Sequence, residues 1–246
     1  MKLLALLLLA AASLAAANEV LIVADEFPAM QVLAKKLETG AGAGCALVEQ
    51  TAIPAGLARY SALIVYIHRN IGEAAEKAFV DYAQSGGKLI LLHHSISSGK
   101  RKNQFWFPSF LEMSLPEKEF SAGGYKYYEG IAMELVNLAP GHYVTTNNVK
   151  YPATTDYRSA ARPAIELDDT EVYLNHVFTG ERTILLSIKF QDSKTGTLFQ
   201  QDTGGWIKPA GKGTVFYFMA GHSVKDFENP AYAQIVVNAV NSKIGD

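Results

Sequence analysis

The sequence predicts an α/β protein with a mainly parallel sheet covered by helices on both faces. Three apolar segments, at 20–24, 62–67 and 88–92, lack the polar alternation of a half-exposed strand and are typical of strands buried on both faces. Segments with helical spacing lie between them, and strands that alternate with helices favour parallel pairing. We therefore expect these three strands to be adjacent, parallel and interior in one sheet.

The composition is that of a globular protein with a large core. Hydrophobic residues make up 49% of the 246 residues and charged residues 19%, which excludes a disordered chain. The formal net charge of −2 predicts no electrostatic attraction to nucleic acid or to anionic membranes. The single cysteine, Cys45, excludes an internal disulfide and a cysteine-built metal site, and we expect it to be buried.

The N-terminus has the parts of a secretory signal peptide. One lysine precedes an apolar run at 3–12, and small residues follow up to Ala17. We expect cleavage after Ala17, so that residues 1–17 are the signal peptide and residues 18–246 form one periplasmic or secreted α/β domain. The apolar run is short for a membrane-spanning helix, and no cysteine follows it to carry a lipid, so no stable membrane anchor is expected.

The first half of the mature chain alternates strands with helices. Residues 30–37 carry apolar side chains at helical spacing, and the glycines after them end this helix. A short strand is expected at 46–48. An amphipathic helix at 72–83 precedes the strand at 88–92.

The second half is less regular. Residues 95–173 lack a clean period, so long loops with short strands are predicted there, of the kind that often cover a site. Strands are expected at 183–188, 197–201 and 214–219. A proline in the first turn marks a closing helix at 230–240.

Polar side chains follow four of the expected strands. They are Asp25-Glu26, His68-Arg69-Asn70, His93-His94-Ser95 and His222-Ser223. Ligands bind outside the carboxyl ends of the strands in open α/β sheets, and histidine can donate, accept, bind metal or move a proton near neutral pH. We therefore expect His93 and His222 on one concave surface at that edge, with Tyr173 or Glu171 close by.

Three chemistries are open for such a site. A serine hydrolase needs Gly-x-Ser-x-Gly, but His93 and Ser97 stand where the glycines belong around Ser95. A zinc site needs three or four ligands, and no His-x-x-x-His or His-Glu-x-x-His spacing is present. The histidines available for it are His93, His94, His142, His176 and His222.

The third chemistry is general acid/base work on a sugar. It needs a carboxylate and a histidine beside an aromatic platform. The side chains of these types are Asp168, Asp169, Glu171, Tyr173 and Trp106.

Two stretches carry recognisable motifs. Residues 86–93 read Gly-Gly-Lys-Leu-Ile-Leu-Leu-His, and residues 211–222 read Gly-Lys-Gly-Thr-Val-Phe-Tyr-Phe-Met-Ala-Gly-His. Both resemble motifs of the ThuA-like (trehalose utilization) family. Glu171-Val172-Tyr173 is similar to that family's Asp-Glu-x-Tyr element, and Asn229-Pro230 with the closing helix fits its ending.

The resemblance implies a flavodoxin-like three-layer sandwich of the class I glutamine amidotransferase-like superfamily, with residues 18–246 as a single ThuA-like domain. Amidotransferases of that superfamily place a cysteine nucleophile at the elbow after a central strand. This chain has His93-His94 there, so glutamine hydrolysis is not expected. The family's link to disaccharide metabolism implies a sugar as the substrate class.

We therefore interpret the chain as an exported protein that acts on or binds a sugar or an oxidised sugar at the carboxyl edge of the sheet. The expected catalytic residues are His93, His222 and Glu171. The expected substrate-binding residues are Asp25, His68, His94, Trp106 and Tyr173. A small carbohydrate is the expected partner, and no cofactor, metal ligand or nucleic acid is predicted. A non-catalytic carbohydrate- or partner-binding module and a metal-assisted hydrolase are the alternatives.

Overall fold

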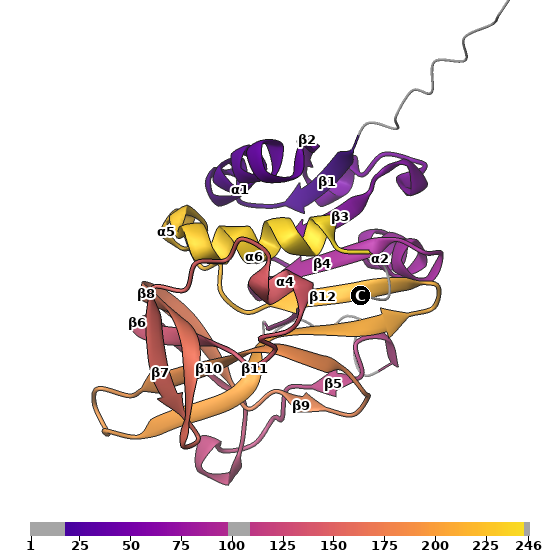
Figure 1. Cartoon of the computed structure of the whole chain (residues 1–246). Coiled ribbons are helices and arrows are strands. Elements are labelled where there is room, and N and C mark those ends of the chain that lie inside the picture. The colour runs from indigo at the N-terminus through magenta and orange to yellow at the C-terminus, as the bar shows by residue number, and fades with distance from the viewer. Residues whose placement is uncertain (1–17, 98–108, 244–246) are drawn as a thin grey trace, which may run out of the picture.

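A computed structural model describes residues 18–97 and 109–243, and these build one large mixed sheet with helices packed on it (Figure 1). The sheet has ten strands in the order β2-β1-β3-β4-β12-β11-β10-β6-β8-β7. One half is parallel and the other antiparallel. Strands β12 and β11 form the boundary between the two halves, because β12 pairs parallel with β4 and antiparallel with β11.

The parallel half confirms the expected central strands. Strand β1 pairs parallel with β3, and β3 pairs parallel with β4, so the three lie side by side inside the sheet. Their apolar runs are buried on both faces, which explains the missing alternation. The strands of this half are β1 (Glu19–Ala24), β2 (Gly44–Val48), β3 (Ala62–Tyr66), β4 (Lys88–Leu92) and β12 (Gly213–Phe218).

The antiparallel half corrects the predicted fold class. A flavodoxin-like sandwich with a mainly parallel sheet is wrong, because the large sheet has five antiparallel pairings beside its four parallel ones. The strands of this half are β6 (Lys126–Asn137), β7 (Ala153–Tyr157), β8 (Ala160–Leu174), β10 (Thr183–Gln191) and β11 (Leu198–Ala210). A small separate sheet pairs β5 (Met113–Ser114) with β9 (Val177–Phe178).

The region read as loops with short strands contains two of the longest strands. Strand β6 has 12 residues and β8 has 15, and their pairing shifts register between Glu129 and Ile131 and again between Ile131 and Met133. Each register shift inserts an unpaired residue and reverses which face the next side chains occupy. The period of two is therefore broken in the sequence, although the strands are continuous.

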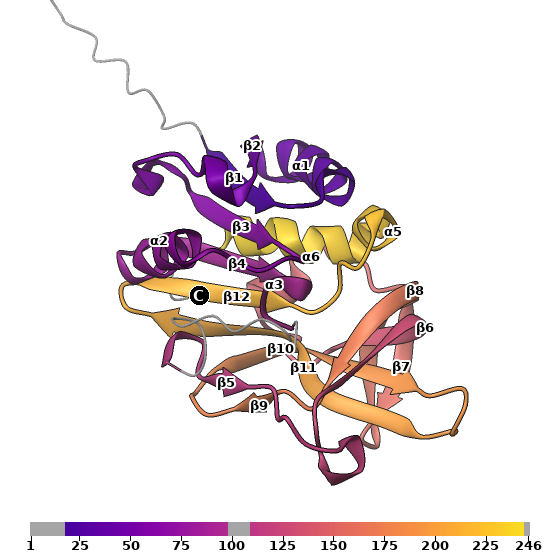
Figure 2. The same ribbon diagram turned by 180° about the vertical axis from the view of Figure 1, so that it is seen from behind.

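Helices cover both faces of the parallel half. Helix α6 (Pro230–Asn241) packs against α1 (Phe27–Ala41) on one face, and α2 (Glu73–Gln84) lies on the other, as the two opposite views show (Figures 1 and 2). These helices are the three that the spacing predicted, although α1 starts earlier, at Phe27. Short helices α3 (His94–Ser97), α4 (Tyr143–Thr146) and α5 (Val224–Glu228) lie in the connections. Among the described residues, no helix combines the length and apolar character that a membrane crossing requires.

Gly213, at the start of β12, provides a test of how closely β12 approaches the turn before β4. A β-carbon at Gly213 would lie 2.2 Å from the carbonyl oxygen of Gly87 and 2.3 Å from that of Ala83. Both are backbone atoms that cannot rotate away. We expect Gly213→Ala to lower the free energy of unfolding by roughly 2–3 kcal/mol, measured by urea denaturation.

The matched control is Gly44→Ala in β2, because a β-carbon at Gly44 meets nothing within 4 Å. This variant should unfold within roughly 0.5 kcal/mol of the wild type. Equal stability of the two variants would contradict the close approach at Gly213.

Candidate functional site

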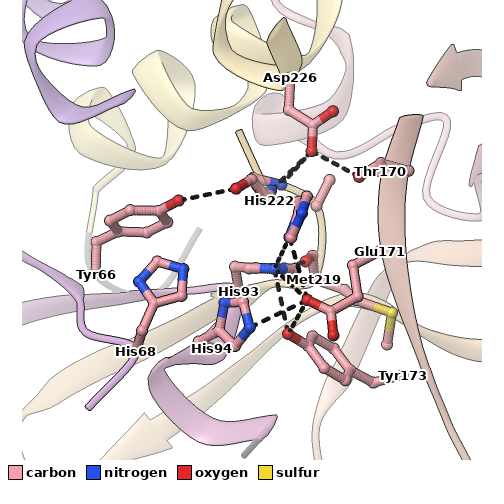
Figure 3. Close-up of polar contacts among 12 residues, drawn as sticks. Tyr66, His68, His93, His94, Thr170, Glu171, Tyr173, Met219, His222 and Asp226 are labelled. Carbon is pink, nitrogen blue, oxygen red and sulfur yellow. Dashed lines mark hydrogen bonds and ion pairs between the residues drawn. The ribbon is translucent and has the colours of Figure 1, made fainter. Parts of the chain in front are cut away.

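The candidate site lies where the carboxyl ends of the parallel strands face β8 (Figure 3). His68 follows β3, His93 follows β4 and His222 follows β12 by a short loop. Glu171 comes from β8 in the antiparallel half. The Nε2 atom of His93 lies 3.3 Å from Nδ1 of His222 and 3.1 Å from Oε2 of Glu171. The expected meeting of the two histidines beside Glu171 is therefore present in the structure.

His93 is held rigidly at the end of β4. Its backbone N–H donates to the carbonyl of Phe218 at 2.8 Å, and its Nδ1 lies 2.7 Å from the carbonyl oxygen of Met219. Its φ of 48° lies in the left-handed region, which costs a non-glycine residue about 1 kcal/mol. The two contacts with the β12 end fix this conformation, so the fully buried ring has one orientation, with Nε2 toward Glu171.

Two bulges bring Glu171 to the histidines. Gly130 of β6 and Asp169 of β8 both have positive φ, 61° and 56°, at the two register shifts in the β6–β8 pairing. A bulge bends a strand and re-aims the side chains beyond it. The carboxylate of Glu171, 2% exposed, therefore points at the ends of β4 and β12.

One carboxylate oxygen is the centre of the cluster. Oε2 of Glu171 lies 3.1 Å from His93 Nε2, 3.0 Å from His94 Nε2 and 3.2 Å from His222 Nδ1, and it accepts a hydrogen bond of 2.8 Å from the Tyr173 hydroxyl. Burial raises the pKa of the Glu171 carboxyl, but the hydrogen bonds with His222, His93 and His94 outweigh burial and hold that pKa well below its ordinary value. Glu171 is therefore ionised in the folded protein.

The three imidazoles differ in their proton affinity. Burial lowers the pKa of His94 to about 4 against an opposing hydrogen bond with Glu171, and burial also lowers the pKa of His93. The hydrogen bond with Glu171 raises the pKa of the more exposed His222. His93 and His94 are therefore neutral at pH 7, and His222 is the ring that most readily carries a proton.

Asp226 positions His222 without touching the imidazole cluster. Its buried Oδ2 accepts from the backbone N–H of Gly221 at 2.9 Å and of His222 at 2.8 Å. It also accepts from the hydroxyl of Thr170, the neighbour of Glu171, at 2.7 Å. One carboxylate thus ties the loop after β12 to β8.

Asp25 and His68 form a second polar pair at the edge of the cluster. The backbone N–H groups of His68 and Arg69 donate to the Asp25 carboxylate, and His68 Nδ1 lies 3.3 Å from its Oδ1. Burial raises the pKa of Asp25, but these hydrogen bonds outweigh it and lower the pKa to about 2. An ionised Asp25 accepts the Nδ1 proton of His68 and so leaves Nε2 as an acceptor. The centre of the His68 ring is 4.0 Å from that of His94.

Seven of the eight residues predicted for the site are in or beside this cluster. They are Asp25, His68, His93, His94, Glu171, Tyr173 and His222. The eighth, Trp106, lies outside the described residues. Asp168 and Asp169 are exposed on β8 and make none of the cluster's contacts. The structure therefore selects Glu171 from the acidic run as the carboxylate of the site.

The two histidines not named for the site have other surroundings. His142 caps α4, where its Nδ1 accepts from the N–H of Val144. His176 is stacked near Tyr125 and Tyr173, and burial lowers its pKa to about 3.

The comparisons with known proteins show the family of the chain. A family model described as ThuA, trehalose utilisation, matches residues 23–241. The chain belongs to the ThuA family. The family predicted from the resemblance is thereby confirmed. No protein of curated function matches the sequence.

Solved structures support the ThuA fold. A ThuA-like protein from Parabacteroides merdae superposes with a TM-score of 0.64 at 14% identity, over 94% of this chain and 92% of that one. A ThuA-like protein from Bacteroides uniformis gives 0.62 at 20% identity, over 92% of each chain. A cytoplasmic protein from Salmonella typhimurium gives 0.57 at 16% identity, over 91% of this chain and 98% of that one. At these identities the likeness shows the fold alone.

A separate surface groove of this ThuA-family chain lies away from the cluster histidines. It has a volume of about 1230 Å³ and runs along α2, with residues 50–61 on its other side. Its lining includes Tyr60, Asp81 and Tyr82 but no histidine. We place the candidate site at the histidine cluster, because several imidazoles and a buried carboxylate converge there, whereas the groove is lined by no histidine.

No pattern in the sequence points to Asp226 as a residue of this site. We expect Asp226→Ala to lower the free energy of unfolding by roughly 2–4 kcal/mol, because it leaves three donors, two of them buried and one partly buried, without their acceptor. Urea denaturation measures this loss. The control is Asp81→Ala, which removes an exposed ion pair with Lys77 and should cost less than about 1 kcal/mol. Similar losses in both variants would show that Asp226 does not anchor the loop.

Proposed function

We propose that this ThuA-family protein is an exported enzyme that acts on a sugar or an oxidised sugar at the histidine cluster. The observation that carries the proposal is the ionised, buried Glu171 carboxylate, which is surrounded by three imidazoles and a phenol at the carboxyl edge of the sheet. Such a concentration of buried polar groups costs stability and is typical of a functional site. The family's description, trehalose utilisation, supports a carbohydrate as the substrate class.

The accessible members of the cluster suit a sugar. The side chains of His222, His68 and His94 are 33%, 19% and 18% exposed, so a ligand can reach them from solvent. Imidazoles both donate and accept hydrogen bonds, which matches the hydroxyl groups of a sugar. His93 is fully buried and so acts by positioning its neighbours, which modifies the catalytic role that the sequence suggested for it.

The Asp25–His68 pair is the best-placed group for proton transfer. Asp25 fixes the imidazole with Nε2 as the acceptor, as a carboxylate does when it orients a catalytic histidine. His68 is then the group that takes a proton from the sugar, and Asp25 stabilises the imidazolium that forms. His222, whose pKa is raised chiefly by its hydrogen bond with Glu171, is the matching proton donor.

The test is turnover of a panel that contains trehalose, other disaccharides, monosaccharides and their keto derivatives, followed by chromatography of the products. We expect His68→Gln to lower kcat by about 10²- to 10⁴-fold, the usual contribution of a general base, with a smaller change in sugar affinity. The control is His142→Asn, which changes a histidine outside the cluster and should leave turnover unchanged. Sugar binding without turnover of any panel member would favour a non-catalytic carbohydrate-binding module instead.

Export has its own test. Mass spectrometry of the protein collected from the periplasm or medium should show an N-terminus at Asn18 or within a few residues of it, since the small residues that end at Ala17 suit signal peptidase. Protein that retains Met1 and the apolar run would contradict export by cleavage.

A further inference from the structure

We propose that His93, His94, His222 and Glu171 bind a divalent transition-metal ion. One nitrogen or oxygen from each residue is available as a ligand, and these four atoms all lie within 4.8 Å of one another. This inference goes beyond the proposed function, because it concerns metal binding and stands or falls without any sugar. It also departs from the sequence-based expectation that the site contains no metal ligand.

The hydrogen bonding of His93 directs its second ring nitrogen at the Glu171 carboxylate. The carbonyl oxygen of Met219 can only accept, so Nδ1 of His93, 2.7 Å away, carries the ring's proton. The other ring nitrogen, Nε2, points at Oε2 of Glu171 at 3.1 Å. A cation placed beside this pair would be bound by both atoms, a ring nitrogen and a carboxylate oxygen.

The crowding around Glu171 leads to the same conclusion. Its Oε2 already accepts the proton of the Tyr173 hydroxyl, and nitrogen atoms of His93, His94 and His222 approach the same oxygen within 3.2 Å. One oxygen cannot accept four good hydrogen bonds, because it has two lone pairs. If the three nitrogens and the carboxylate oxygen bind one metal ion instead, the oxygen does not have to accept a hydrogen bond from each nitrogen.

The separations between the atoms match a coordination shell. Four ligands placed tetrahedrally at 2.0–2.1 Å from a zinc ion are about 3.3 Å apart. The distances from Glu171 Oε2 to the three ring nitrogens are 3.0, 3.1 and 3.2 Å, and His93 Nε2 is 3.3 Å from His222 Nδ1. The two remaining separations, from His94 to His93 and from His94 to His222, lie within 4.8 Å, so binding an ion requires the His94 ring to move closer to the other two.

The surroundings are those of a metal site open on one side. The Met219 carbonyl orients His93 and the Tyr173 hydroxyl orients Glu171, which are the outer contacts that fix metal ligands. His93 and Glu171 are buried, whereas His94 and His222 are partly exposed, so solvent or a substrate oxygen can reach the ion from their side. Three imidazoles with one carboxylate favour zinc and its first-row neighbours over magnesium or calcium.

The test is metal binding by the tag-free protein after it has been stripped with a chelator. Titration calorimetry with Zn²⁺ should give one site per chain with a dissociation constant below about 1 μM, and a hundredfold excess over that constant should raise Tm by at least about 5 °C. Glu171→Gln and His222→Ala should each weaken binding by at least about 100-fold, because each removes a ligand. The control His142→Asn should bind as the wild type does.

X-ray absorption of the Zn²⁺-loaded wild type provides a measurement that needs no variant to fold. It should show three imidazoles and a carboxylate oxygen at about 2.0–2.1 Å. Absence of a single site, another ligand set, or undiminished binding by both folded variants would overturn the proposal. Zinc binding without sugar turnover would support the metal site and contradict the proposed function. Sugar turnover in protein that binds no zinc would support the proposed function and contradict the metal site.

Discussion

The buried charge of Glu171 is the constraint on which the rest of the site depends. An ionised carboxylate that is 2% exposed is stable only with close polar partners, since its desolvation costs several kcal/mol. Those partners come from the end of β4, from the start of α3, from the loop after β12 and from β8 itself. The carboxylate therefore holds together segments from both halves of the sheet, and each segment must be placed accurately for the charge to be tolerated.

The mixed sheet explains how one site draws on such distant segments. Parallel strands present their carboxyl ends at one edge, so β1, β3, β4 and β12 bring Asp25, His68, His93 and His222 together. The antiparallel half approaches that edge from the other side of β12 and brings Glu171 and Tyr173. A purely parallel sheet would supply the histidines without this carboxylate. The two halves therefore contribute different chemistry to one place.

The site is also maintained at a cost in stability. His93 has a left-handed backbone, Asp169 has a positive φ at a bulge, and Asp226 is a buried acid that serves backbone donors. Strain and buried polar groups of this kind persist where the surrounding structure over-determines them, and they concentrate at functional sites. The arrangement explains why the cluster is rigid. Its donors and acceptors are placed before any ligand arrives, and preorganisation of this kind favours both metal binding and catalysis.

The sequence by itself determined the parallel half of the fold and the histidine side of the site. Continuous apolar runs identify strands buried on both faces, and His68, His93 and His222 follow such strands directly or by a short loop, so their meeting needs only parallel pairing. Only the tertiary structure decided the rest. The bulges at Gly130 and Asp169 break the strand period, so β6 and β8 resemble loops, and Glu171 is indicated in the sequence only by the similarity of its motif to the ThuA-like family. The role of Asp226 and the convergence of the four candidate ligand atoms likewise depend on contacts between residues far apart in the chain. The spacing of residues along the sequence does not reveal such contacts.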